Sequence, residues 1–485
     1  MKVLFISSEV VPFAKTGGLA DVSGSLPVWL KQHNNDVCVI TPLYRTTMKC
    51  FRQDLKRIDT FDIGIGDNVY NGEIWQGRLK SSVPVFFIRC DTFFDRDRLY
   101  GNDMGDFTDN AERFIFFCRS VFVCCLKTGF LPDILHCNDW QTGLVPAYLK
   151  TLYSGNDFSS TATVFTVHNI AYQGIFEQKK FSLTGIPDAF FTPDGLEYWG
   201  DMCLLKAGFI YADVINTVSK KYSKEIQTPE LGFGMEGVLA SRKGKLFGIL
   251  NGVDYEAWDP LHDTLIAAQY SKKSIRRKHL CKEALVHDVK LPDIRIDKPL
   301  IGCISRLADQ KGFDLLNDIF EELMDLDIGF VLLGTGDLRY HDVFKALGNK
   351  YDKQVRIILA YDNVLAHKIE AGCDMFLMPS RYEPCGLNQI YSLRYGTIPI
   401  VRATGGLDDT IVHYDKETQQ GTGFKFHHYS AAALLQAVKE AVEMYNIPEK
   451  WKMLVQNAMS CDFSWEKSAQ QYVALYKRAL EHKRG

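Results

Sequence analysis

The 485-residue chain is too long for a single compact core, so we expect two or three domains. A net charge of −3 with 24% charged residues gives no support for binding to nucleic acid or to a membrane surface. The stretch closest to a membrane span, residues 114–126, is interrupted by Arg119 and falls short of the roughly 18–20 residues that cross a bilayer.

The first residues and the cysteines bear on the compartment. The apolar run over 3–6 is too short for a signal peptide and is soon followed by Glu9, so we interpret it as a first strand. None of the 13 cysteines forms a Cys-x-x-Cys pair. Reduced, mostly buried thiols therefore fit better than a disulfide scaffold or a zinc site, and we expect a cytoplasmic protein.

Strand-like and helix-like runs alternate along the first half of the chain. Several strand-like runs are apolar throughout, which predicts a parallel sheet covered by helices on both faces. Residues 61–78 differ, because their glycine-punctuated alternation predicts an antiparallel hairpin. We expect strands at 2–7, 36–41, 83–89, 134–137, 163–167 and 214–218, and helices at 18–31, 110–126 and 143–151.

The same alternation restarts after residues 248–254, where Asn251-Gly252 predicts a turn and a hinge. This second doubly wound α/β unit is followed by an amphipathic helix over 464–481. We therefore expect three parts, residues 1–247, 248–460 and 461–485. The second unit has predicted strands at 300–304, 330–333, 356–359, 375–378 and 398–401, and helices at 313–324, 340–347, 364–371 and 387–395.

The loop after the strand at 375–378 combines a carboxylate with the start of a helix. Gly386, Leu387 and Asn388 open the helix, whose free N–H groups and partial positive charge suit a phosphate. Glu383 would repel a phosphate and is better suited to bind hydroxyl groups beside it. A sugar attached to a diphosphate satisfies both demands.

Two other loops place glycines or cations at the start of a helix. Gly17-Gly18, with Lys15 nearby, would let backbone N–H groups approach a diphosphate, although a plain tight turn is the alternative. This loop has neither the dinucleotide-binding pattern nor the P-loop pattern. Arg306 and Lys311 follow the strand at 300–304 and suit a phosphate, with a solvated basic loop as the alternative.

Further polar groups follow strands in both halves. Thr404-Gly405-Gly406 repeats the double glycine, or serves only as a turn. His168 and Asn169 end one strand, although a lone histidine there is more often structural. Asp139 would orient a sugar hydroxyl or cap the next helix. Because all these groups lie at the carboxyl ends of strands, where doubly wound sheets bind ligands, their clustering favours a functional site.

These motifs resemble the bacterial-type glycogen synthases and the related plant starch synthases. The resemblance implies the glycosyltransferase B fold, two doubly wound Rossmann-like α/β domains that face a cleft. Residues 1–247 would be the acceptor side, 248–460 would bind the nucleotide sugar, and the helix in 461–485 would cross back to the first domain. The matching stretches are KTGGLADV from Lys15, NDWQTG from Asn138, FTVHNIAYQG from Phe165, NGVD from Asn251, SRLADQKG from Ser305, SRYEPCGLNQIY from Ser380 and TGGLDDT from Thr404.

The resemblance also implies a reaction. Glucose would pass from ADP-glucose to the non-reducing end of an α-1,4-glucan, either glycogen or a maltooligosaccharide, with retention of configuration and without a metal or other cofactor. UDP-glucose as the donor and a catalytically inactive glucan-binding relative remain alternatives. Asn388 stands where this family more often has Thr, and Tyr391 stands where related retaining transferases carry a second Glu. Both departures bear on how the donor is bound.

Roles for the residues follow from this resemblance. Arg306 and Lys311 would hold the leaving diphosphate, Glu383 would bind glucose hydroxyls, and Lys15 would reach the donor. Tyr361 would stack on the base. The predicted catalytic residues are Glu383, His168, Arg306, Lys311, Asp139 and Lys15. The predicted substrate-binding residues are Lys15, Gly17, Gly18, Asp21, Asn169, Tyr361, Cys385, Gly386, Leu387, Asn388, Thr404, Gly405 and Gly406.

Overall fold

The computed structural model describes residues 1–155, 157–291 and 293–484. The chain forms two compact units. Unit 1 comprises Met1–Val218, Ser223–Gly252 and Trp465–Gly485, and unit 2 comprises Ser219–Tyr222 and Val253–Ser464. The main passage from unit 1 to unit 2 thus lies within the segment 248–254, where the Asn-Gly turn predicts a hinge.

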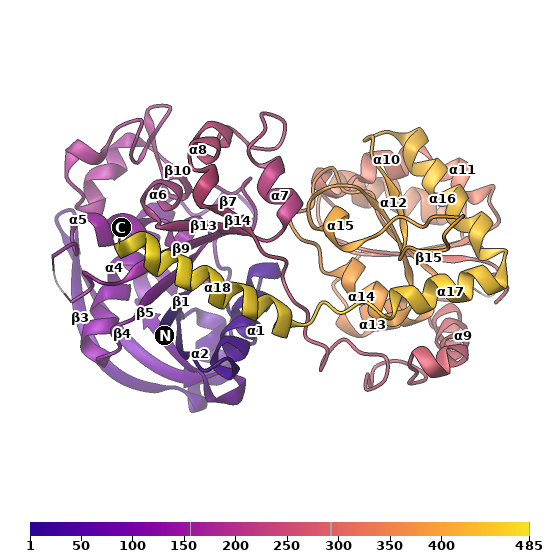
Figure 1. The fold of residues 1–485 in the computed structure, drawn as a ribbon, viewed down its shortest axis with the longest axis horizontal. Helices are drawn as coiled ribbons and strands as arrows, with labels where there is room; N and C mark the ends of the chain where they lie inside the picture. Colours follow the sequence, from indigo (N-terminus) through magenta and orange to yellow (C-terminus); the bar gives the residue numbers. More distant parts are fainter. Residues whose placement is uncertain (156, 292, 485) are drawn as a thin grey trace. The chain divides into compact units, whose positions relative to one another are not determined.

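Unit 1 is built on a nine-stranded sheet with the order β14-β13-β9-β8-β1-β2-β5-β4-β3 (Figure 1). The strands from β14 to β5 are parallel, whereas β4 and β3 form an antiparallel hairpin at the edge. This confirms the hairpin predicted from residues 61–78. The strands are β1 (Lys2–Ile6), β2 (Asp36–Pro42), β3 (Lys56–Ile65), β4 (Asn68–Arg78), β5 (Pro84–Arg89), β8 (Ile134–Asn138), β9 (Ala162–Val167), β13 (Val214–Thr217) and β14 (Leu246–Gly248).

Helices cover both faces of this sheet, and the last helix of the chain, α18 (Trp465–Arg484), is one of them. It packs against α1 (Gly18–Gln32) and the strands β8, β9 and β13 (Figure 1). The positions that periodicity assigns to its apolar face are buried: Trp465, Ala469, Tyr472, Leu475, Tyr476 and Ala479. The other main helices of unit 1 are α2 (Arg45–Phe51), α4 (Asn110–Thr128), α5 (Leu144–Thr151), α6 (Leu204–Tyr211) and α8 (Glu236–Ser241).

Unit 2 is a six-stranded parallel sheet with the order β17-β16-β15-β18-β19-β20. Its strands are β15 (Leu300–Ile304), β16 (Gly329–Leu333), β17 (Val355–Ile358), β18 (Met375–Met378), β19 (Ile398–Arg402) and β20 (Phe424–Phe426). Its helices are α9 (Lys278–Asp288), α10 (Phe313–Asp318), α11 (Phe320–Met324), α12 (Leu338–Lys350), α13 (Asn363–Gly372), α14 (Asn388–Tyr395), α15 (Gly405–Thr410), α16 (Ala431–Tyr445) and α17 (Pro448–Ala458).

One predicted helix is divided in two. The single helix expected over 313–324 breaks at Ile319, which adopts φ −105° and ψ 5° between α10 and α11. Ile319 is buried, and a β-branched side chain loses conformational freedom in a helix, so the break occurs where a helical backbone is disfavoured. In the part of the chain that the structure describes, no helix is both long and apolar enough to cross a bilayer.

Candidate functional site

The main sheet of each unit has a point at which the strand order reverses, and several of the predicted residues follow the strands on either side of it. In unit 1 the reversal lies between β1 and β8, and in unit 2 between β15 and β18. The loops after two such strands run to opposite faces of the sheet and leave a crevice at their carboxyl ends, which is where doubly wound sheets bind ligands. The candidate site is described below for each unit separately.

In unit 2, Lys311 and Glu383 meet at this point. Lys311 Nζ lies 2.6 Å from Glu383 Oε2, although 72 residues separate the two along the chain. Ser380 Oγ donates to the same carboxylate oxygen over 3.1 Å. The side chain of Glu383 is buried, so the positive charge of Lys311 offsets the cost of removing a carboxylate from water. The sequence places both residues in loops, and the fold brings them into contact.

Two glycines allow other backbone segments to pack closely against the Glu383 loop. Gly312 has φ +74°, and a Cβ added there would lie 2.0 Å from the carbonyl oxygen of Pro379. Gly405 has φ +46°, and its Cβ would lie 1.9 Å from the carbonyl oxygen of Glu383. These approaches are far shorter than any van der Waals contact, so only glycine fits. The double glycine at 405–406 is therefore required for backbone packing, and its contact with a substrate stays a prediction.

The helix after Glu383 begins almost where the sequence predicts, at Asn388 rather than at Leu387. Gly386 takes the left-handed conformation with φ +71°, and Asn388 Nδ2 donates to the carbonyl oxygen of Ile304 over 2.9 Å. This bond ties the start of α14 to the end of β15. Because the side-chain amide is used in this way, a phosphate at this helix would depend on backbone N–H groups.

Gln389 is a positioning residue that sequence reasoning missed. Its fully buried amide nitrogen donates to the carbonyl oxygens of Cys385 and Gly386 over 3.0 and 3.1 Å. These bonds fix the turn between Glu383 and the helix. A polar side chain in the first turn of a helix, inside a motif already singled out, is the signal that could have identified it.

Two other predicted residues of unit 2 are exposed. Arg306 lies in the loop after β15, and Tyr361 lies between β17 and α13 with 80% of its surface accessible. The predicted stacking of Tyr361 on a base stays a prediction. Asp362, next to Tyr361, caps α13 by accepting the backbone N–H of Leu365 over 2.9 Å, which fixes the loop.

Tyr391 packs inside unit 2 in a way that the sequence does not reveal. Its ring stacks on Trp258 with the centroids 4.1 Å apart, and His367 stacks on the opposite face of Trp258 at 3.7 Å. His367 Nδ1 in turn lies 2.8 Å from Asp263 Oδ2. Trp258 therefore packs between His367 of α13 and Tyr391 of α14, and this stack holds the segment that carries Trp258 against the two helices.

In unit 1, Asp139 and His168 meet at the ends of the adjacent strands β8 and β9. Asp139 Oδ1 accepts the backbone N–H of His168 over 2.7 Å. His168 Nε2 lies 3.0 Å from Asn138 Oδ1, and Asn138 Nδ2 donates to the carbonyl oxygen of Ile6 over 3.0 Å. That second bond identifies Oδ1 as the acceptor, so Nε2 of His168 carries the proton and Nδ1 is left as an acceptor.

Burial shifts the pKa values of Asp139 and His168. Burial raises the pKa of Asp139 to about 7, helped by the nearby carboxylate of Glu9 and opposed by the N–H groups of His168 and Asn169. Burial also lowers the pKa of His168 to about 3. At neutral pH the imidazole is therefore neutral and binds a ligand through hydrogen bonds rather than through charge. Asn169 Oδ1 accepts the N–H of Ala171 over 3.1 Å, which orients its side chain.

The Lys15 loop follows β1 and leads into α1, which begins at Gly18 as predicted. Lys15 Nζ forms an ion pair with Asp21 Oδ1 at 2.7 Å, so these two predicted residues neutralise each other. A Cβ added at Gly17 or Gly18 would meet no atom within 4 Å. Glycine at these positions therefore leaves open space in front of the backbone, as an approaching ligand requires.

Glu9 is the second residue that sequence reasoning missed. Its buried carboxylate accepts the backbone N–H and the hydroxyl of Thr16, each over 2.5 Å, and the N–H of Gly17 over 3.2 Å. Tyr100 donates its hydroxyl to the same carboxylate over 2.7 Å. Glu9 thus holds the Lys15 loop in place. A carboxylate directly after a buried strand is the signal that could have identified it.

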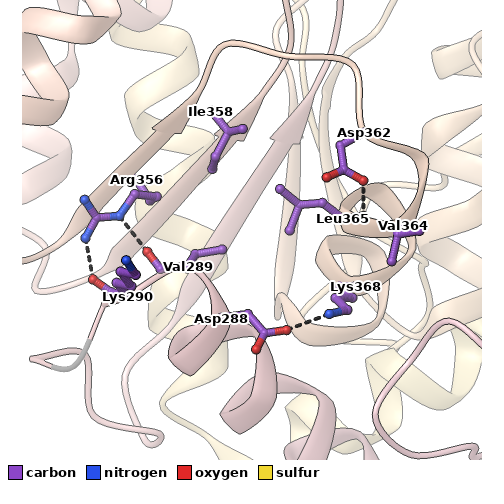
Figure 2. Close-up of a pocket in the computed structure, with 9 residues that line it drawn as sticks. All are labelled: Asp288, Val289, Lys290, Arg356, Ile358, Asp362, Val364, Leu365 and Lys368. Atoms are coloured by element: carbon purple, nitrogen blue, oxygen red, sulfur yellow. Dashed lines mark hydrogen bonds and ion pairs between the residues drawn. The ribbon is translucent and has the colours of Figure 1, made fainter.

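A hollow of about 370 Å³ in unit 2 is lined by Asp362 and Leu365 of the α13 cap, but by none of the residues that the sequence predicts for the site (Figure 2). Arg356 points to the carbonyl oxygens of Val289 and Lys290, and Lys368 pairs with Asp288 at 2.6 Å. Among the described residues, no group of three or more His, Cys, Asp or Glu side chains is placed to hold a metal ion.

Comparisons with known proteins identify the family of this chain. Residues 2–241 match the family described as starch synthase catalytic domain, and residues 290–459 match glycosyl transferases group 1. The glycogen synthase of Koribacter versatilis is 46% identical, with 99% of each chain covered, and that of Thermosipho africanus is 44% identical over the full length of both.

Solved structures give the same result. The catalytic domain of starch synthase IV from Arabidopsis thaliana, bound to ADP and acarbose, is 34% identical, with a TM-score of 0.90 and 99% of each chain covered. Sucrose-phosphate synthase from Thermosynechococcus elongatus, at 17% identity and a TM-score of 0.59, shares the fold alone. The chain therefore belongs to the glycogen and starch synthase family of glycosyltransferases and has its two-domain glycosyltransferase B fold.

Proposed function

We propose that this glycosyltransferase transfers glucose from ADP-glucose to the non-reducing end of an α-1,4-glucan, with retention of configuration and release of ADP, in the cytoplasm. The observation that carries the proposal is the Lys311–Glu383 pair, a cation and a carboxylate joined at the strand-order reversal of unit 2. Support comes from relatives named glycogen synthase and from the starch synthase structure, which holds ADP and acarbose.

The groups of unit 2 fit a nucleotide sugar. Lys311 would contact the leaving diphosphate, together with Arg306 and the backbone N–H groups at the start of α14. The negative charge that develops on the diphosphate as its bond to the sugar breaks is stabilised by such preorganised donors. Glu383, held by Lys311 and Ser380, would accept hydrogen bonds from glucose hydroxyls and favour positive charge on the ring.

The groups of unit 1 would act on the transferred glucose and on the acceptor. The neutral ring of His168, with its proton on Nε2, offers Nδ1 and the backbone carbonyl to hydroxyl groups. Asp139 and Asn169 would fix further hydroxyls. Lys15 and the open backbone at Gly17 and Gly18 would contribute to the donor phosphates, and Lys15 would leave Asp21 to do so.

In the reaction that we propose, no protein carboxylate forms a bond to the sugar. The bond from C1 to the phosphate oxygen breaks, the acceptor hydroxyl oxygen bonds to C1 on the same face, and its proton passes to the departing phosphate oxygen. This scheme keeps the configuration at C1 with a single carboxylate, Glu383, whereas double displacement needs a nucleophile and an acid close together. No metal takes part in the proposed scheme.

The experiment measures nucleoside diphosphate release from ADP-glucose and, separately, from UDP-glucose, each with and without glycogen. Glycogen-dependent release from ADP-glucose is expected, at a higher rate than from UDP-glucose. A higher rate with UDP-glucose would replace the proposed donor. Release from neither donor, with glycogen binding retained, would favour a glucan-binding protein without catalysis.

A further inference from the structure

Unit 1 carries a second pocket, lined by none of the residues assigned above. Its volume is about 540 Å³. Its walls come from the 3₁₀ turn η1 (Arg52–Asp54) after α2, from the start of β3, and from β4 and the end of β5. These three strands lie side by side at the edge of the sheet (Figure 1). The pocket is therefore built on regular structure rather than on a loop.

Positive charge predominates in this pocket. Among the described residues that line it, Glu73 is the one carboxylate and is shared by Arg57 and Arg89 at 3.2 and 3.3 Å. Asp91, just outside, binds Arg89 through two hydrogen bonds of 2.7 and 2.9 Å. With Asp91 included, an excess of two positive charges remains, although the chain as a whole has a net charge of −3. The cations that line the pocket are Arg52, Lys56, Arg57 and Arg89.

Arg52 and Lys56 carry this excess, because within the described ranges neither side chain has a carboxylate partner. Arg52 lies over Trp75, with its guanidinium carbon 4.4 Å from the ring centroid, and donates one long bond of 3.4 Å to the carbonyl oxygen of Leu55. The contact with Trp75 holds the guanidinium in place, and its hydrogen bond to Leu55 uses only Nη1. A planar fork of N–H groups is the geometry that binds a phosphate.

Trp75 lines this pocket but offers no surface on which the sugar rings of a glucan could stack. Its side chain is only 4% exposed, and its indole N–H donates to Glu73 Oε2 over 2.7 Å. A sugar ring cannot stack on Trp75, because Arg52 already covers the face of its ring. Recognition here depends on charge.

We propose that this pocket binds a phosphate ester of a small metabolite, at a site separate from that of the nucleotide sugar. The two negative charges of a phosphomonoester match the excess charge contributed by Arg52 and Lys56. The volume falls in the usual range for small-molecule sites and leaves room for the organic part of the ester. The site does not depend on the proposed donor or acceptor.

The test is a calorimetric titration of the full-length chain with a hexose monophosphate at low ionic strength, with the free hexose and inorganic phosphate as comparison probes. We expect saturable binding of the ester that weakens as NaCl is added, and no binding of the free hexose. Lys56→Glu should weaken the affinity about tenfold or more, because an exposed cation that contacts the phosphate is lost. Lys49→Glu, the same change at another exposed lysine, in α2 and outside the pocket, should leave the affinity unchanged.

A further variant separates this pocket from the proposed donor site. The Lys311→Ala variant should bind the hexose monophosphate as tightly as the unmodified chain. Loss of binding in that variant, or unchanged binding in Lys56→Glu, would overturn the proposal, and so would the absence of saturable binding. Inorganic phosphate that binds as tightly as the ester would overturn the assignment of an ester.

Discussion

The backbone N–H of Gly406 donates to the carbonyl oxygen of Glu383 over 3.0 Å, so the loops that follow β18 and β19 support each other. The carboxylate of Glu383 is held independently by Lys311, from the loop after β15. Three loops of unit 2 thus fix both the backbone and the side chain of one residue. Such support keeps a reacting group in position without reorganisation during the reaction.

Replacement of Gly405 by alanine should disturb this arrangement. The added Cβ would lie 1.9 Å from the carbonyl oxygen of Glu383, at a backbone φ of +46°. We expect the free energy of unfolding to fall by at least about 1–2 kcal/mol, and glucan-dependent ADP release to fall with it. Urea unfolding followed by circular dichroism measures the free energy of unfolding.

Gly17→Ala is the matched comparison, because its Cβ would meet no atom within 4 Å and its φ is −150°. That variant should keep full stability, and a Gly405→Ala protein that is equally stable would contradict the steric argument.

The variant Glu383→Gln tests the carboxylate itself. Glutamine keeps the size of the side chain but loses the charge that pairs with Lys311, so we expect kcat to fall by roughly 10²–10³ while the fold is retained. Steady-state ADP release, with circular dichroism to check folding, measures this. Glu322→Gln, which removes an exposed carboxylate from α11, should leave kcat unchanged. Near-normal turnover of Glu383→Gln would show that Glu383 does not act on the reacting sugar.

Glu9 is expected to act through the Lys15 loop. In the variant Glu9→Gln, the amide cannot accept all the hydrogen bonds that Thr16, Gly17 and Tyr100 donate to the carboxylate. The Lys15 loop should therefore become less well ordered. We expect kcat/KM for the donor to fall by up to about 10²-fold. A double-mutant cycle with Lys15→Ala checks the route, because the double variant should be no worse than Lys15→Ala alone. Fully additive losses would mean that Glu9 acts in some other way.

The pH dependence of stability should report on His136. Its ring lies between Tyr476 Oη and Thr166 Oγ1, each at 2.8 Å, and burial lowers its pKa to about 3. The pKa of His136 in the folded state lies below the ordinary value of roughly 6.5. The stability that the neutral ring contributes to the folded state is therefore complete above pH 6.5 and is lost as the pH falls toward 3. Between pH 6.5 and pH 5 the free energy of unfolding should fall by about 2 kcal/mol because of this residue.

Urea unfolding at the two pH values should therefore show a smaller pH-dependent loss in His136→Asn than in the unmodified chain. His482→Asn, which replaces an exposed histidine of α18, should keep the full dependence. If all three proteins lose stability equally, His136 is charged in the folded state and the argument fails.

Much of the fold follows from the sequence alone, because a strand apolar on both faces has few alternatives to a parallel sheet. The strands β15 and β18 have the predicted bounds, and α18 buries the predicted face. The helix over 313–324 was predicted wrongly as continuous, because its apolar spacing does not reveal the backbone break at Ile319. Two of the domain boundaries that we predict differ by a few residues from the compact units, because a turn in the sequence identifies only an approximate position. The short segment Ser219–Tyr222, which belongs to unit 2, was not predicted.

The site could be predicted only in part. Glu383 and Lys311 were each identified from their loops, but their contact depends on which strands are neighbours. From the sequence, Gly405 and Gly406 could form either a phosphate-binding loop or a simple turn. The structure gives another reason for glycine at these positions, which is the close packing against Glu383 and Cys385. The stack of Tyr391 on Trp258 joins residues more than a hundred positions apart, and no local pattern predicts it.

The bond between His136 and Tyr476 spans 340 residues and has a consequence for synthesis. Unit 2 is inserted into unit 1, so a ribosome completes nearly all of unit 1, then the whole of unit 2, before α18 emerges. Until that moment the apolar surface that Trp465, Tyr472 and Tyr476 later cover is open to water, and His136 lacks one of its partners. During this interval the nascent chain exposes a surface of the kind that chaperones bind, and unit 2 is free to fold first.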